Sequence, residues 1–177
     1  MPALRAPAAL AAVALVTSLL AGPHAARAEP PRWTLQVDPL TTALGYVHLQ
    51  VERALTPDWS IYVGPHLRLF DSVLDDKDEP YIGIGVELGV RWFFHGEAPE
   101  GAWAQVRGVL AHVTTDDPVE ATSAGGYVSA LVGYTAILGD VFVLAGGAGV
   151  QYLDYGVGGY GVEGVFPALH TALGVAF

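Results

Sequence analysis

The chain has 177 residues, of which 52% are hydrophobic and 10% aromatic, and it contains no cysteine. Eight basic against 18 acidic residues give a net charge of −10 at pH 7, which argues against nucleic acid as a partner. Without cysteine a disulfide-held scaffold is excluded, so packing and backbone pairing must stabilise the fold.

The first 28 residues predict a cleaved secretory signal peptide. Arg5 gives a positive start, residues 8–21 form an apolar run, and Ala26-Arg27-Ala28 matches a small-residue cleavage site. Because this run is too short to cross a membrane as a helix, we expect export rather than anchoring. Residues 29–177 then have the length of one domain.

Period-two alternation dominates the mature chain and is clearest in residues 81–93. One face of that segment is apolar throughout, whereas the other mixes glycines with Glu87 and Arg91. No segment after the signal has the helical periodicity needed to cover so many apolar faces. The pattern predicts an all-β fold, an eight-stranded antiparallel up-and-down transmembrane β-barrel with its apolar face toward lipid.

Eight strands are expected in chain order, at residues 33–38, 43–54, 59–70, 81–93, 102–113, 127–138, 141–153 and 169–177. Short connections (55–58, 94–101, 139–140) alternate with longer ones (71–80, 114–126, 154–168), as in outer-membrane barrels. The short connection 39–42 is the exception, and without a turn there the count becomes seven. An even count is usual for single-chain bacterial barrels, so eight is favoured.

Aromatic residues are sorted between the two ends of these strands. Trp33, Trp59, Trp92 and Trp103 fall at the short-turn end. Tyr46, Tyr81, Tyr127 and Tyr152 fall at the opposite end, where Tyr155 and Tyr160 join them in the last predicted loop. Because amphipathic rings favour membrane interfaces, the sequence predicts two aromatic girdles.

The last strand alternates Leu169, Thr171, Leu173, Val175 and Phe177 with small or polar residues. This ending resembles the C-terminal assembly signal of bacterial outer-membrane proteins, and the whole mature chain resembles small eight-stranded outer-membrane barrels. Val37-Asp38-Pro39-Leu40, Gly45 and residues 51–55 resemble the opening of an uncharacterised outer-membrane β-barrel domain family. The resemblance implies a Gram-negative outer membrane, contact with its lipid and lipopolysaccharide, and recognition by the barrel assembly machinery; it implies no activity.

The alternation places a polar set in the lumen: Asp38, His48, Gln50, Glu52, His66, Arg68, Glu87, Arg91, Arg107 and His170. Three carboxylates and three arginines in a narrow interior must pair, because an unpaired buried charge is costly. We therefore predict an internal salt-bridge plug. The glycines 83, 85, 89, 147 and 149 leave room on one wall, which keeps a binding or translocation path open as an alternative.

Neither a cofactor nor a metal is predicted from these residues. His48, His66 and His170 lie on three different expected strands and lack the spacing of a metal motif. His112-Val113-Thr114, with Glu120 nearby, is spaced like the His-x-Ser of barrel-type lipid A deacylases, but threonine replaces serine and the flanking residues differ. We expect a structural or surface-interaction barrel without catalysis. The main alternative function is a narrow channel or a binder for a small, apolar solute, and the third is a hydrolase that modifies lipid A. The alternative for the fold is a soluble barrel in the periplasm.

The predicted loop 71–80 is strongly acidic. It carries five acids, Asp71, Asp75, Asp76, Asp78 and Glu79, against one lysine. A solvated loop is the default there, and weak divalent-cation binding that bridges to lipopolysaccharide is the alternative.

Pro65 falls inside the third strand, where it cannot donate a hydrogen bond to the neighbouring strand, so a bulge is expected beside Gly64.

Overall fold

The structure is a computed structural model that describes residues 30–43, 45–68, 81–115, 120–157 and 160–177. Residues 31–177 form one compact unit. Its elements are β1 (Trp33–Val37), α2 (Pro39–Ala43), β2 (Tyr46–Thr56), β3 (Trp59–Arg68), β4 (Tyr81–Glu97), β5 (Glu100–Thr115), β6 (Ala121–Leu138), β7 (Phe142–Val157) and β8 (Tyr160–Ala176). Among the described residues, no helix has the length and apolar character needed to cross a membrane.

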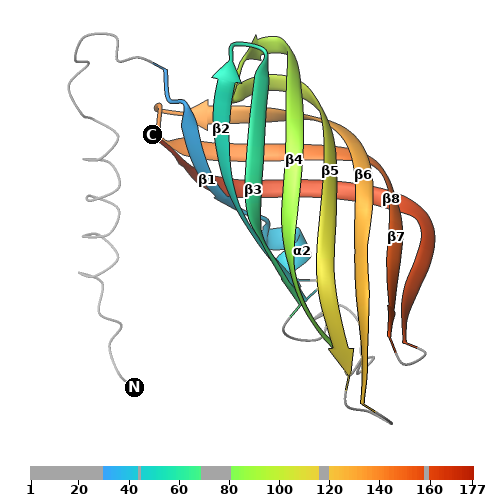
Figure 1. The fold of residues 1–177 in the computed structure, drawn as a ribbon. Helices are drawn as coiled ribbons and strands as arrows, with labels where there is room; N and C mark the ends of the chain where they lie inside the picture. Colours follow the sequence, from blue (N-terminus) through green and yellow to red (C-terminus); the bar gives the residue numbers. More distant parts are fainter. Residues whose placement is uncertain (1–29, 44, 69–80, 116–119, 158–159) are drawn as a thin grey trace, which may run out of the picture. The chain divides into compact units, whose positions relative to one another are not determined.

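The eight strands form one antiparallel up-and-down sheet that closes on itself as a barrel (Figure 1). Each strand pairs with the next along the chain, and β1 closes the ring by pairing with both β2 and β8. At the closure Thr34 lies opposite Glu52 on one side and Ala176 on the other. The prediction of an all-β, eight-stranded, up-and-down barrel is confirmed.

The short segment after β1 is one helical turn, which keeps β1 and β2 separate and excludes the seven-stranded alternative. Asp38 begins the turn, because its Oδ1 accepts hydrogen bonds from the backbone nitrogens of Leu40 (3.0 Å) and Thr41 (3.1 Å). Gly45 follows the helix with φ of 91°, a left-handed conformation that glycine adopts without strain. The chain thus reverses direction part-way along the barrel and not at its rim.

The strands at the long-loop end extend further than predicted. β6 begins at Ala121, and β7 and β8 pair continuously from Phe142↔Val175 to Val157↔Tyr160. The predicted loop 154–168 is therefore wrong, and most of the predicted loop 114–126 is also strand. Their glycines and polar residues suggest loops, but tall hairpins are stabilised by cross-strand backbone pairing, which composition does not report. The acidic loop 71–80 lies outside the described residues.

The bulge expected at Pro65 is absent from the described ladders. Pro65 pairs with Val86 of β4 in an unbroken register, and on the β2 side the ladder passes from His48↔His66 to Val51↔Val63 without a shift. The missing N–H interrupts pairing locally without inserting a residue. Gly64 allows this close approach, since a Cβ there would lie 1.6 Å from the backbone oxygen of Leu49.

Residue polarity is inverted relative to a soluble protein. Large apolar side chains such as Leu88, Val106 and Leu110 are exposed on the outside, while charged and amide side chains are buried inside. Both follow from the period-two geometry of strands, which sends alternate side chains to opposite faces.

One part of the aromatic prediction is wrong. Trp33, Trp59 and Trp92 lie on the outside, each 39–47% exposed, but Trp103 is fully buried inside the barrel. Among the tyrosines, Tyr127 and Tyr155 also point inward and are buried. Trp103 lies near a strand end, which favoured a place in the girdle. It is, however, four residues from Arg107 on the same strand, so both side chains point to the same face, the interior.

Candidate functional site

The polar interior of the barrel is the candidate functional site. All ten side chains assigned to it from the sequence are buried, each exposing 5% or less of its surface. They are Asp38, His48, Gln50, Glu52, His66, Arg68, Glu87, Arg91, Arg107 and His170. In the structure eight of them fall into two clusters, one around Arg91 and one around Glu87, whereas Asp38 and Arg68 have other surroundings.

The Arg91 cluster lies toward the short-turn end. Arg91 donates from Nη1 to Glu52 Oε2 at 2.7 Å and from Nε to Gln105 Oε1 at 2.6 Å. Its Nη2 lies 2.9 Å from His170 Nε2, so that nitrogen accepts and the proton of His170 resides on Nδ1. Glu52 also accepts hydrogen bonds from Thr34, Gln36 and Ser60, and both partners of the ion pair are therefore satisfied.

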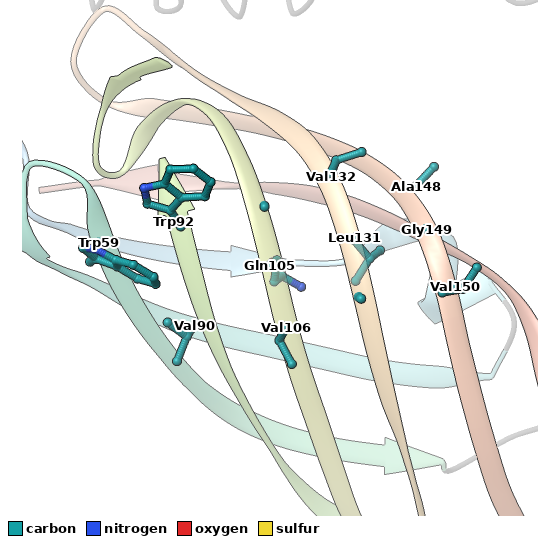
Figure 2. A pocket seen from close by; sticks show the side chains of 12 residues that line it. Trp59, Val90, Trp92, Gln105, Val106, Leu131, Val132, Ala148, Gly149 and Val150 are labelled. Carbon is teal, nitrogen blue, oxygen red and sulfur yellow. The ribbon is translucent and has the colours of Figure 1, made fainter. Parts of the chain in front are cut away.

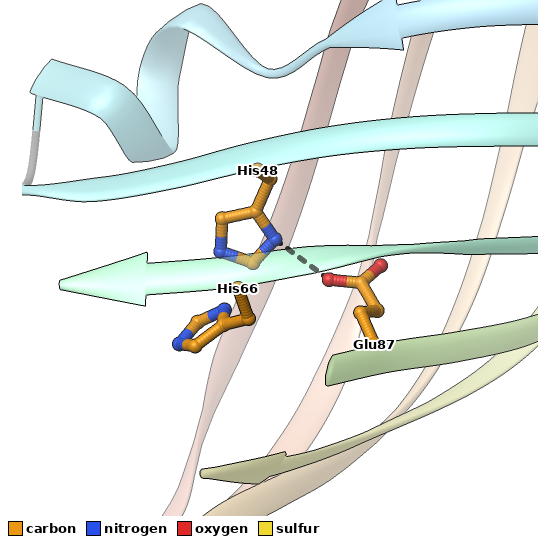
Figure 3. A group of neighbouring side chains, drawn as sticks. All are labelled: His48, His66 and Glu87. Atoms are coloured by element: carbon orange, nitrogen blue, oxygen red, sulfur yellow. Dashed lines mark hydrogen bonds and ion pairs between the residues drawn. The ribbon is translucent and has the colours of Figure 1, made fainter. Parts of the chain in front are cut away.

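The Glu87 cluster lies further along the barrel, where β2, β3 and β4 meet (Figure 3). Glu87 Oε2 lies 2.6 Å from His48 Nδ1 and accepts from the Tyr127 hydroxyl at 3.2 Å. Its Oε1 accepts from Gln50 Nε2 at 3.2 Å and lies 3.6 Å from Arg107 Nη1. His66 completes the cluster, with its ring centroid 4.3 Å from that of His48.

The remaining predicted charges, Asp38 and Arg68, have different surroundings. Asp38 caps α2, accepts from the Thr171 hydroxyl at 2.6 Å, and lies 3.7 Å from His170 Nδ1. The Arg68 guanidinium lies over the ring of Tyr46, 5.8 Å from its centroid. Three acids and three arginines thus share one interior, in which ion pairs join Glu52 with Arg91 and Glu87 with Arg107.

Large aromatic side chains fill the room that the glycines leave. A Cβ added at Gly89 would lie 2.2–2.4 Å from the Tyr62 ring, and one at Gly147 would lie 2.6 Å from Trp103. Trp103 is held there by a hydrogen bond from its Nε1 to Thr135 Oγ1, 2.9 Å, and by Arg91 over its ring at 4.8 Å. The glycines are therefore required for close packing at this level of the barrel.

A pocket of about 340 Å³ opens at the side of the barrel, where α2 faces β8. β1 pairs with β8 only over Thr34–Val37, so residues 160–172 of β8 pair with β7 alone among the described strands. Interior, helical and outward side chains line the pocket together: Tyr46, His48, His66, Arg107, Tyr127, Gln151, Leu153, Tyr155, Leu40, Thr41, Val162, Pro167 and Leu169. It therefore connects the Glu87 cluster with the outer face.

The residues considered for catalysis are not brought together. His112 points outward and is exposed, and no hydrogen bond within the described ranges joins it to a serine or threonine. Ser60 is bonded to Glu52, and Ser129 accepts from Arg107 Nε at 2.8 Å. Ser72 falls outside the part of the chain that the structure describes. Among the described residues, no serine hydroxyl is therefore hydrogen-bonded to a histidine.

The residues of the predicted assembly signal occupy β8 and its end. Leu169, Leu173, Val175 and Phe177 point outward, with Phe177 66% exposed. Thr171 instead binds Asp38 through both its hydroxyl and its backbone nitrogen. The acidic residues Asp71, Asp75, Asp76, Asp78 and Glu79, predicted as a cation-binding loop, lie outside the described residues.

Sequence reasoning missed the inward aromatic residues and the association of two histidines with Glu87. Tyr62 shares the parity of His66 and Arg68 on β3, which is a signal the alternation contained. Tyr127 shares the parity of Ser129 on β6, whereas no charged interior residue on β7 marks Tyr155. The pairing of His48 with His66 depends on the β2–β3 register, which the sequence left open.

Comparisons of the chain with protein-family models, curated proteins and solved structures found no match.

Proposed function

We propose that the chain is a non-catalytic integral barrel of a bacterial outer membrane with a structural or surface-interaction role. The observation that carries the proposal is where the outward charges lie. Among the described residues, every outward-facing Asp, Glu or Arg within a strand lies within three residues of a strand end. They are Arg53, Glu97, Glu100, Asp154 and Glu163. An uncharged band around the strand centres, with polar rims, is what a hydrocarbon layer requires.

The outer surface between these rims is largely apolar. Figure 2 shows part of it, a groove of about 450 Å³ that crosses β3 to β7 and has no charged side chain in its lining. Trp59 and Trp92 stack at its short-turn end, 6.4 Å between centroids, and Val90 and Val106 continue it. Exposed apolar surface on this scale is unfavourable in water and marks contact with lipid or protein.

The packed interior supports a structural role over conduction. The Arg91 cluster and the aromatic rings of Tyr62 and Trp103 fill the short-turn half of the barrel. Within that cluster the ion pair of Arg91 with Glu52 is satisfied by hydrogen bonds. Opening a path there requires breaking a buried ion pair, which costs several kcal/mol, about 3–5 by analogy with other buried pairs. We therefore expect the purified barrel not to conduct in planar lipid bilayers.

Cell fractionation combined with gel mobility before and after boiling tests the proposal. We expect the protein in the outer-membrane fraction, migrating faster unheated than boiled because the closed sheet resists detergent. Recovery of the folded protein from the soluble periplasmic fraction would overturn the membrane assignment and favour the soluble periplasmic barrel.

The side pocket favours a second candidate, a binder for a small amphiphilic or apolar molecule. Its walls pass from Arg107, the histidines and Leu153 to the outward-facing Val162 and Leu169, so one molecule would place a polar group inside and a hydrocarbon chain outside. Photolabelling in nanodiscs with a diazirine-bearing dodecanoic acid tests it. Adducts on Leu40 and Leu153, lost in Leu153→Trp, support a binder; adducts spread evenly over the outward face exclude it.

A further inference from the structure

The Glu87 cluster gathers three metal-ligating side chains that the sequence did not predict to meet. His48, His66 and Glu87 each offer one ligand atom, and these atoms all lie within 4.8 Å of one another (Figure 3). The three side chains come from neighbouring strands β2, β3 and β4, whose backbones hold them at one level of the barrel. All three are at least 98% buried.

His66 has a free ligand atom in this cluster. Its Nε2 lies 3.0 Å from the Tyr155 hydroxyl, whereas its buried Nδ1 has no hydrogen-bond partner among the described residues. When the hydroxyl accepts a hydrogen bond from Nε2–H, the proton of the neutral ring is on Nε2 and the lone pair of Nδ1 is left available. A metal-binding histidine commonly has this arrangement, with its second nitrogen fixed by a neighbouring acceptor. A buried nitrogen without a partner is otherwise a cost to the fold.

His48 and Glu87 supply the other two ligands. The 2.6 Å contact between His48 Nδ1 and Glu87 Oε2 is a short hydrogen bond, and a metal can replace its proton with a small separation of the two atoms. Arg107 and Gln50 both engage the other oxygen, Oε1, and so hold the carboxylate with Oε2 toward His48. The carboxylate is thus positioned by its own neighbours.

From these contacts we propose that His48, His66 and Glu87 form a binding site for a divalent transition metal, Zn²⁺ foremost, inside the barrel. Two imidazoles and one carboxylate form a common set of three protein ligands for zinc, with a fourth position left for water or another small ligand. That fourth position is reachable, because His48 and His66 both line the side pocket of about 340 Å³.

The donor set of two imidazoles and one carboxylate decides which metals the site selects. The guanidinium of Arg107 faces Glu87 at 3.6 Å and weakens the attraction of the carboxylate for every cation, so the nitrogen ligands must supply most of the affinity. Imidazole nitrogens bind Zn²⁺ or Cu²⁺ strongly, whereas Ca²⁺ and Mg²⁺ require several oxygens. We therefore expect binding of Zn²⁺ and no measurable competition from Mg²⁺ or Ca²⁺.

The test is isothermal titration of ZnCl₂ into full-length protein purified from membranes without a polyhistidine tag. We expect one Zn²⁺ per chain, and affinity lowered by on the order of tenfold or more in His66→Gln and in Tyr155→Phe, which removes only the hydroxyl that fixes the ring. His112→Gln is the matched control, because His112 is an exposed histidine on the outside of β5. Its affinity should equal that of the wild type.

A second measurement uses only wild-type protein and so does not depend on the folding of variants. Bound Zn²⁺ should protect His48 and His66, but not His112, from acylation by diethyl pyrocarbonate, as read by peptide mass spectrometry. Substitution by Co²⁺ should give the visible absorption of a four-coordinate site. Absence of a stoichiometric heat, equal loss of affinity in His112→Gln, or uniform acylation in the presence of Zn²⁺ would each overturn the proposal.

Discussion

Arg91 carries a full charge in the barrel interior, and its polar neighbours offset the free energy of removing that charge from water. Each of its three guanidinium nitrogens faces an oxygen or nitrogen of another interior side chain, within 2.6–2.9 Å. The rings of Tyr62 and Trp103 flank the same group at 5.1 and 4.8 Å. Because the charge is compensated only by this surrounding set, the set is expected to respond as a unit to substitution.

Glu52→Gln should destabilise the barrel by about 3–5 kcal/mol, because it leaves the buried charge of Arg91 without its carboxylate. Urea unfolding in lipid vesicles, followed by tryptophan fluorescence, measures the change. The double variant Glu52→Gln/Arg91→Met should lose less than the sum of the single variants, since it removes both charges.

Glu97→Gln provides the control for that experiment. Glu97 is an exposed acid at the end of β4, so its neutralisation should change stability by no more than about 0.5 kcal/mol. Equal losses in Glu52→Gln and Glu97→Gln would show that the interior ion pair contributes nothing specific.

At the scale of elements, β1 and β8 determine how the ring closes. β1 has five residues, whereas β8 has 17, so only the short-turn part of β8 pairs across the closure. Backbone hydrogen bonds between Trp33 and Phe177, 2.9 and 3.0 Å, extend this pairing to the last residue. Further along, Asp38 and α2 replace a strand, which produces the pocket beside β8.

Phe177→Asp should reduce insertion into the outer membrane and leave processed protein in the periplasm. The substitution keeps the backbone bonds to Trp33 and changes only an outward side chain at the rim, where a charge costs about 0–1 kcal/mol. A severe defect would therefore reflect lost recognition during assembly. Fractionation and mobility of the unheated protein measure it.

Ala176→Ser is the neighbouring control, because Ala176 is buried inside the barrel and should tolerate a hydroxyl with little effect. Normal insertion of Phe177→Asp would show that the terminal ring contributes only packing at the rim.

At the scale of the whole molecule, the inverted polarity separates a membrane barrel from a soluble one. Leu88 lies outward near the middle of β4, paired between Val63 and Gly108, and is 59% exposed. Phe94 also points outward but lies near the short-turn end of the same strand. The two positions differ in expected membrane depth while sharing a face and a strand.

Leu88→Arg should cost about 2–4 kcal/mol of stability in lipid vesicles, and Phe94→Arg only about 0–1 kcal/mol, because the cost of arginine falls from the membrane midplane to its rim. In a soluble barrel both substitutions would change stability by about 0.5 kcal/mol or less. Urea titration of the two refolded variants distinguishes these outcomes. Equal and small effects at Leu88 and Phe94 would contradict the membrane assignment.

Much of the architecture was predictable because it depends on a local rule. The alternation of side chains along a strand is fixed by backbone geometry, so the sequence alone predicted an eight-stranded barrel and the ten polar residues that face inward. The same rule places Trp103 inside, because it lies four residues before Arg107 on β5. Nearness to a strand end is a weaker signal, since it does not determine which face of the sheet a side chain takes.

Strand length and register were decided only by the tertiary structure. The hairpin of β7 and β8 extends through 154–157 and 160–168 because each of these residues gains a partner across the ladder, which no single segment encodes. Register likewise determines that His48 meets His66 and Glu87, whereas His170 lies with Arg91. The sequence by itself thus determined which side chains enter the interior. Only the closed sheet decided their heights and partners, because those depend on how distant strands align and not on the pattern within any one of them.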